Sequence, residues 1–91
     1  MKTAQAGTLE SSDILITVVP QEAGSGIRIE IDSIVSLQYG EAIQAVIADT
    51  LAEAGVADML VKAMDRGALD CTIKARLMTA LDRARANGGN V

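Results

Sequence analysis

IRIEIDS, residues 27–33, is the stretch that decides the fold. Three isoleucines alternate in it with three charged residues, which predicts a β-strand with one buried face and one face in water. Directly after it the apolar residues recur at helical spacing, which predicts a helix over residues 33–54. The positions on this side of the helix are Val35, Tyr39, Ala42, Ile43, Val46, Ile47, Thr50, Leu51 and Ala54. A strand therefore runs straight into a helix, so the domain contains both kinds of element.

Working outward in both directions, two more strands and a second helix are expected. Residues 14–19 are rich in β-branched side chains and end at Pro20, which is typical of a strand. The Gly- and Ser-containing residues 21–26 would join it to the next strand as an antiparallel hairpin. Residues 58–64 alternate again, with Met59, Val61 and Ala63 on one side. After a turn, the apolar stripe Leu69, Ile73, Leu77, Ala80, Leu81 and Ala84 predicts a helix to about Arg85.

The limits of the first helix are marked by two residues. Ser33 could cap its start, because a serine hydroxyl accepts a hydrogen bond from a free amide of the first turn. Gly55 suits the left-handed position that ends a helix, and Val56 suits the apolar position after it.

The order strand, strand, helix, strand, helix predicts an α+β domain of two layers. In it a three-stranded sheet carries two helices on one face, and the strands joined through the first helix are parallel. Residues 1–12 are small and polar and are expected to form a flexible N-terminal arm. Residues 13–86 would form the single domain, and residues 87–91 a frayed tail.

Composition and charge exclude several classes of function. The chain has 91 residues, a net charge of −4 and one aromatic residue, which argues against binding nucleic acid through phosphates or by stacking. It has no histidine and a single cysteine, so neither a metal site nor an internal disulfide is expected. The longest apolar run is too short to cross a membrane, and the N-terminus does not resemble a secretion signal. We therefore expect a cytoplasmic protein.

Candidate catalytic residues are few. Glu30 and Asp32 lie on the wet face of their strand and are expected to be solvated. Cys71 falls in the first turn of the second helix, where a lone cysteine is more often part of the core than reactive. A nucleophile has no histidine to activate it, so the chain is not expected to be catalytic.

Two adjacent serines, Ser11 and Ser12, lie in the expected arm. An exposed serine in such a segment could carry a covalent group, because a modifying enzyme can reach it. From composition alone, however, polar serines are ordinary residues of an arm.

Three segments give this chain a family resemblance. They are GTLESSD (residues 7–13), QYGEAI (residues 38–43, followed by Gly55 and Val56) and DRGALDC (residues 65–71, followed by ARL at 75–77). Together they resemble the acyl carrier protein (gamma) subunit of citrate lyase, in the family's order and spacing, over about residues 7–86. The resemblance also covers Cys71 and Arg76, for which packing and solvation are the only roles we expect.

The resemblance implies a carrier that is not itself a catalyst. In this family one serine holds 2'-(5''-phosphoribosyl)-3'-dephospho-coenzyme A through a phosphodiester, and its thiol carries an acetyl thioester that is exchanged for citryl. Position by position, that serine is Ser11. Ser12, where some family members have Gly, is the less favoured attachment site. The implied partners are the alpha subunit (acyl transferase), the beta subunit (citryl lyase), a prosthetic-group transferase and an acetylating ligase. The carboxylates of Glu10 and Asp13 could be recognised by basic residues of such partners.

Three alternatives remain open. Asp32-Ser33-Ile34 resembles the phosphopantetheine site of fatty-acid carrier proteins, although Ser33 here follows a strand and those domains are entirely helical. The carrier subunit of malonate decarboxylase uses the same prosthetic group, but residues 65–71 favour citrate lyase. A non-covalent α+β interaction module is the third alternative, because such a fold serves many functions.

Overall fold

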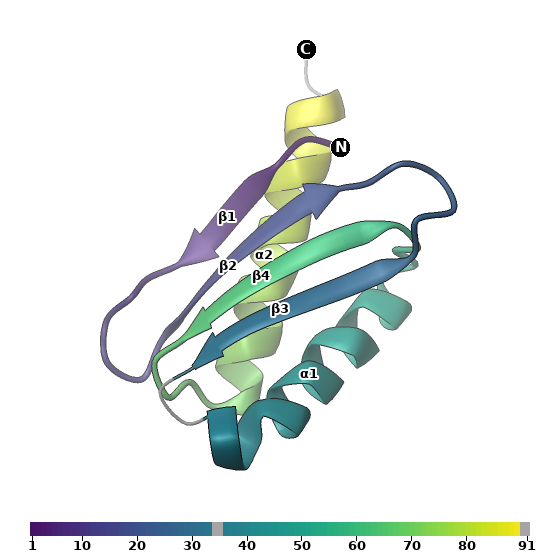
Figure 1. Cartoon of the computed structure of the whole chain (residues 1–91). Helices are drawn as coiled ribbons and strands as arrows, with labels where there is room; N and C mark the ends of the chain where they lie inside the picture. The colour runs from purple at the N-terminus through teal and green to yellow at the C-terminus, as the bar shows by residue number, and fades with distance from the viewer. Residues whose placement is uncertain (34–35, 90–91) are drawn as a thin grey trace.

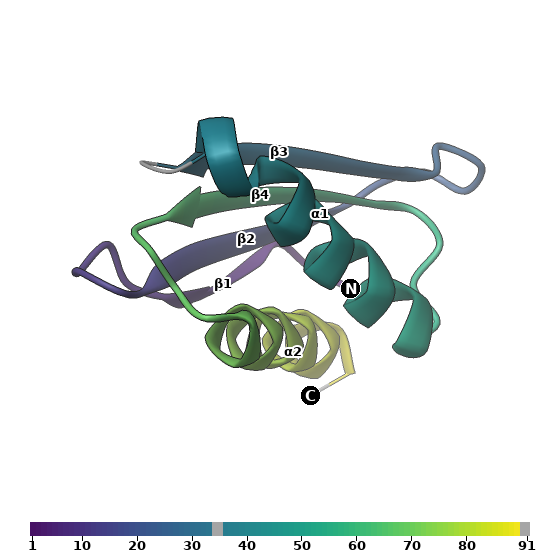
Figure 2. The ribbon, with the colours of Figure 1, turned by 90° about the horizontal axis from the view of Figure 1, so that it is seen from below.

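The computed structural model describes residues 1–33 and 36–89 and shows a four-stranded sheet with two helices (Figure 1). The strands are β1 (Ala4–Gly7), β2 (Ile14–Pro20), β3 (Ile27–Ser33) and β4 (Met59–Asp65). The helices are α1 (Ser36–Glu53) and α2 (Asp70–Gly89). Both helices lie on one face of the sheet, as the end-on view in Figure 2 shows. The predicted two-layer α+β class is confirmed.

The sheet has four strands where the sequence predicted three. The additional strand, β1, comes from the segment expected to be a flexible arm, and it pairs antiparallel with β2 from Ala4 opposite Val18 to Gly7 opposite Leu15. Ala4 and Ala6 are buried and alternate with Gln5. Because alanine is a weak strand former and the segment is short, this alternation is easily overlooked. The small side chains let α2 pack against β1, and the Arg83 guanidinium donates a hydrogen bond to the Gln5 carbonyl at 2.8 Å.

The expected hairpin between β2 and β3 was wrong. The strand order is β1-β2-β4-β3, so β4 lies between the two strands that the hairpin would have joined. β4 pairs antiparallel with β2 and parallel with β3, and the second pairing is the one predicted. The connector of residues 21–26 instead spans the end of β4, where Asp58 accepts hydrogen bonds from the amides of Gly24 and Gly26 at 3.0 and 2.8 Å.

The core lies between the sheet and the helices. Its strand residues are Met59, Val61 and Ala63 from β4, which alternate as predicted, and Ile14, Ile16 and Val18 from β2, which alternate as well. The apolar stripes of the helices meet them through Ile43, Ile47, Leu51, Ile73, Leu77, Ala80, Leu81 and Ala84. One member of the predicted α2 stripe is wrong: Leu69 precedes the helix and is 70% exposed.

The predicted ends of the helices had mixed outcomes. Gly55 has φ 72°, and its amide and that of Val56 donate to the carbonyls of Ala52 and Leu51, which confirms the predicted C-terminal cap. Ser33 ends β3, and residues 34–35, between it and the start of α1 at Ser36, lie outside the described residues, so the cap at Ser33 stays a prediction. α2 continues to Gly89, so part of the expected frayed tail is helical, while residues 90–91 lie outside the described residues.

Candidate functional site

The two serines lie in the loop between β1 and β2, which we call the serine loop (residues 8–13). Residues 10–13 form a β-turn, which is closed by a hydrogen bond from the Asp13 amide to the Glu10 carbonyl at 3.1 Å. Ser11 and Ser12 are both exposed at its corner. The serines are therefore presented by an ordered turn within the sheet, where a flexible arm was expected.

Ser12 differs from Ser11 in backbone conformation. Its φ is 64°, in the left-handed region that favours glycine, and it is the one described non-glycine residue with a positive φ. A glycine at this position would adopt the same φ without strain. The Ser12 amide also donates to the Arg66 carbonyl at 2.8 Å. The backbone of Ser12 is thus part of the support of the turn.

Asp13 holds the serine loop to the rest of the domain. One of its carboxylate oxygens accepts hydrogen bonds from the Ile14 amide at 2.7 Å and from Arg76 Nε at 3.0 Å. The other accepts from the Thr8 hydroxyl at 2.7 Å and from Arg76 Nη2 at 2.8 Å. A bidentate pair of this kind fixes both partners in orientation.

This ion pair shifts the titration of both groups. The hydrogen bonds from Arg76, followed by those from Thr8 and the Ile14 amide, lower the pKa of Asp13 from 3.8 to about 2. In return, the hydrogen bond to Asp13 raises the pKa of Arg76. Asp13 is therefore a carboxylate at any physiological pH.

The turn after β4 supports the same loop. The Arg66 amide donates to the Asp13 carbonyl at 2.8 Å, opposite the bond from Ser12, so the serine loop and residue 66 are joined by two backbone hydrogen bonds. Asp65, only 1% exposed, shapes this turn by accepting from the amides of Gly67 and Ala68 at 3.1 and 3.0 Å. The Ser33 hydroxyl donates to Asp65 at 2.8 Å.

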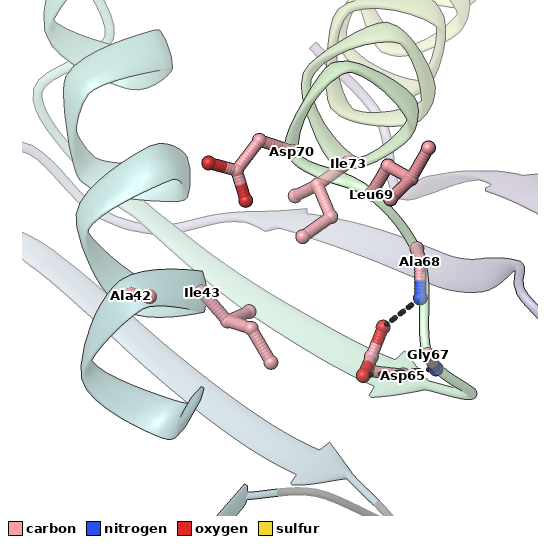
Figure 3. Close-up of a pocket in the computed structure, with 8 residues that line it drawn as sticks. All are labelled: Ala42, Ile43, Asp65, Gly67, Ala68, Leu69, Asp70 and Ile73. Carbon is pink, nitrogen blue, oxygen red and sulfur yellow. Dashed lines mark hydrogen bonds between the residues drawn. The ribbon is translucent and has the colours of Figure 1, made fainter. Parts of the chain in front are cut away.

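A pocket of about 340 Å³ opens next to this turn, between the second turn of α1 and the first turn of α2. Its walls are Ala42, Ile43, Asp65, Gly67, Ala68, Leu69, Asp70 and Ile73 (Figure 3). Ile43 and Ile73 face each other from the two helices, and the Asp70 carboxylate stands in the gap between them.

The three segments that carry the family resemblance thus meet at one end of the molecule. Residues 7–13 contain the serine loop, residues 65–71 contain the turn that supports it, and residues 38–43 reach the pocket beside that turn. Arg76, for which only packing and solvation were expected, is the residue that sequence reasoning missed. The available signal was that Arg76 and Asp13, which have opposite charges, belong to the same family pattern. Because 63 residues separate them in the sequence, their pairing could not be seen from it.

Other sequence candidates have different surroundings. Cys71 is exposed, so its predicted place in the core was wrong. Glu30 and Asp32 are exposed on β3, as predicted. Asp13 is paired with Arg76 and does not face solvent as a free carboxylate, so a partner cannot recognise its charge.

In residues 1–33 and 36–89, acidic and cysteine side chains form no group able to hold a metal ion. Neither α1 nor α2 is long and apolar enough to cross a membrane.

Comparison with known proteins agrees with this geometry. Residues 1–84 match the family model of acyl carrier proteins described as malonate decarboxylase delta subunit. The citrate lyase acyl carrier protein of Streptococcus uberis is 55% identical over 84 residues, which are 92% of this chain and 81% of that protein. Its counterpart from Halothermothrix orenii is 51% identical over 83 residues, covering 91% of this chain and 86% of that protein.

A solved structure shares the fold. One chain of a Pseudomonas malonate decarboxylase hetero-tetramer superposes with a TM-score of 0.74 at 18% identity, over 91% of this chain and 84% of that chain. At this identity the likeness concerns the fold alone, whereas the relatives at 51–55% identity carry the citrate lyase name. The ordered serine turn, the segments that surround it and these relatives together show that the chain belongs to the citrate lyase acyl carrier protein family.

Proposed function

We propose that this protein is the acyl carrier subunit of a citrate lyase and that it carries its prosthetic group on Ser11. The observation that supports the proposal most directly is the serine loop, which exposes two hydroxyls on a turn fixed by Asp13, Arg76 and residue 66. The family membership makes the carrier role the expected one. A carrier needs an exposed attachment point on a stable domain, and this turn is such a point.

The prosthetic group of the proposal is phosphoribosyl-dephospho-coenzyme A, which when attached supplies a thiol that holds an acyl group as a thioester. The residues around Ser11 fit such a group. Ser11 is exposed at the corner of the turn, and its backbone φ is not in the strained left-handed region. The chain's own residues hold the attachment point in place while a long arm reaches from it, which keeps the thiol at high effective concentration near the partner active sites.

Ser11 is preferred to the other two serines on structural grounds. The backbone of Ser12 has a left-handed φ, and its amide donates a hydrogen bond that supports the turn. Ser33 is partly buried, and its hydroxyl donates a hydrogen bond to Asp65. A phosphodiester at Ser33 would break that bond and leave the buried Asp65 with one donor fewer. These features support Ser11 as the attachment site, because its modification does not require the serine loop to unfold.

The partners of the proposal are the acyl transferase (alpha) and citryl lyase (beta) subunits, together with the prosthetic-group transferase and the acetylating ligase. A carrier without catalytic groups requires such partners, and the structural neighbour from a hetero-tetramer is in keeping with a multisubunit assembly. The malonate decarboxylase alternative is less supported, because the relatives at 51–55% identity are named for citrate lyase.

The test is the mass of the protein from its native host, intact and after trypsin. Cleavage separates residues 3–28, which contain Ser11 and Ser12, from residues 29–62, which contain Ser33. We expect the mass of phosphoribosyl-dephospho-coenzyme A on the first peptide, with fragmentation placing it on Ser11, and its loss in Ser11→Ala but not in Ser12→Gly. A phosphopantetheine mass on the second peptide would move the site to Ser33. An unmodified protein, in a host shown to contain the modifying enzyme, would favour the non-covalent interaction module.

A further inference from the structure

The pocket between α1 and α2 has no role in the carrier function as proposed so far. Apart from Ile73, all of its lining residues belong to the second and third segments of the family resemblance. Those segments do not contain the attachment serine. A function for the pocket would explain why these residues are gathered there.

The pocket lies within easy reach of Ser11. The Ser12 amide is 2.8 Å from the Arg66 carbonyl, and Gly67, the next residue, is part of the pocket wall. Adding the covalent distances at each end of that hydrogen bond, the Cα atoms of Ser11 and Gly67 are at most about 8 Å apart. A prosthetic group made of a ribose, an adenosine, a diphosphate and a pantetheine chain is much longer than this path.

The chemistry of the walls selects one part of such a group. Ile43 and Ile73 are almost fully buried and form an apolar floor, and Ala42, Ala68 and Leu69 add apolar wall. The charged side chains of the lining are the carboxylates of Asp65 and Asp70, and the lining contains no basic residue. Phosphates would be repelled here, whereas a neutral chain with methyl groups and amide N–H donors would be accepted.

From the proposed attachment at Ser11, we infer that this pocket binds the pantetheine end of the prosthetic group, with the phosphates left outside. The pocket then shelters the thiol end of the prosthetic group while the group is not bound to a partner subunit. Asp70, at the gap between the helices, is placed to accept a hydrogen bond from an amide of the chain (Figure 3).

The first measurement compares the carrier before and after loading, with the isoleucine methyl groups labelled with ¹³C. Loading is verified by the intact mass. We expect the methyl signals of Ile43 and Ile73 to shift. The signal of Ile27 should stay unchanged, because Ile27 begins β3, whereas Ser33, at the other end of that strand, is bonded to the pocket residue Asp65. Loaded protein with all three signals unchanged would overturn the inference while leaving the attachment at Ser11 intact.

The second measurement is the rate at which the arm's thiol reacts with an alkylating reagent, in a Cys71→Ser background because Cys71 is exposed. Ala42→Leu narrows the pocket, and Ala48→Leu, the same substitution at an exposed position of α1 outside it, is the matched control. If the arm is bound about four-fifths of the time, Ala42→Leu will raise the rate roughly fivefold and Ala48→Leu will not. Equal rates in the two variants would overturn the inference. Absence of the adduct mass would overturn both the inference and the proposed function.

Discussion

At the scale of single residues, Asp13 determines how the serines are presented. Its carboxylate accepts four hydrogen bonds, from Thr8, from the Ile14 amide and from two nitrogens of Arg76. These donors come from the loop itself, from β2 and from α2, so a single side chain connects three parts of the fold. Only 13% of the Asp13 side chain is exposed, which limits the competition from water.

The pH dependence of stability should report this ion pair. Because the pKa of Asp13 is lowered from 3.8 to about 2, the folded protein binds this proton less tightly than the unfolded chain. The contribution is therefore complete above about pH 3.8 and is lost as the pH falls through about 2. In Arg76→Gln we expect the pKa of Asp13 to rise toward its ordinary value, measured by NMR titration of the carboxyl carbon. Between these two pH values the free energy of unfolding of the variant should fall less steeply with decreasing pH than that of the unchanged protein. Lys74→Gln, on the same helix, is the control; an unchanged pKa in Arg76→Gln would contradict the assignment.

Ser12→Gly should stabilise the protein. A left-handed φ costs an L-residue about 1–2 kcal/mol, from which the greater flexibility of glycine in the unfolded chain subtracts about 0.5–1 kcal/mol. We expect a net gain of up to about 1.5 kcal/mol in the free energy of unfolding, measured by urea denaturation. Ser11→Gly, at the neighbouring position without a positive φ, should lower stability instead. A loss of stability in Ser12→Gly would show that its hydroxyl contributes more than its backbone strain costs.

At the scale of elements, β1 makes the serine loop a hairpin. Without this strand the serines would be at the end of a loose chain; with it they are held on both sides, by β1 and by β2. Gly7, the last residue of β1, has φ 102° and lies so close to β2 that a Cβ there would collide with the Ile14 carbonyl oxygen. The tight exit of the chain from β1 into the loop therefore requires glycine.

Gly7→Ala should be strongly destabilising. We expect a loss of roughly 2–4 kcal/mol, because the substitution combines a strained φ with a backbone collision. Gly24→Ala is the matched control, since its φ of 91° is similar but no atom lies within 4 Å of the added Cβ; it should cost only about 1 kcal/mol. Chemical denaturation of both variants measures the difference. Equal losses would mean that β1 does not approach β2 as closely as described.

At the scale of the whole molecule, the net charge of −4 and the position of the serine loop suggest how partners approach. Glu10 is exposed in that loop, whereas Asp13 is paired with Arg76. Recognition of acidic residues by a basic partner surface can therefore use Glu10 but not Asp13. Replacing both residues together would disturb the turn and confuse the two effects.

Glu10→Gln should slow prosthetic-group transfer roughly two- to threefold at low salt, and the difference should disappear at high salt, where screening removes long-range attraction. Initial rates over a salt series measure this. Glu22→Gln, an exposed acidic residue in the connector between β2 and β3, is the control for net charge. If both substitutions slow the transfer equally, the effect comes from total charge and not from the serine loop.

Much of this protein was determined by local sequence. The β-branched residues 14–19, the alternation in residues 27–32 and 58–64 and the helical spacing after each alternating segment were enough to predict three strands and both helices. They also predicted the parallel pairing of β3 with β4, and Gly55 predicted the cap of α1. Ser11 and Ser12 could be selected from residues 7–13. These features depend on neighbours in the chain, whose periodicity and turn preferences are written directly in the sequence.

Other features were decided only by the tertiary structure. The alanines of β1 become a strand because β2 offers an edge and α2 leaves room for small side chains, and β4 enters between β2 and β3 because sheet order depends on long-range packing. The pairing of Asp13 with Arg76 and the support from residue 66 join segments more than 50 residues apart, and the pocket beside them joins residues 42–43 with residues 65–73. Periodicity carries no information about such contacts, since they arise from the folded arrangement of several elements at once.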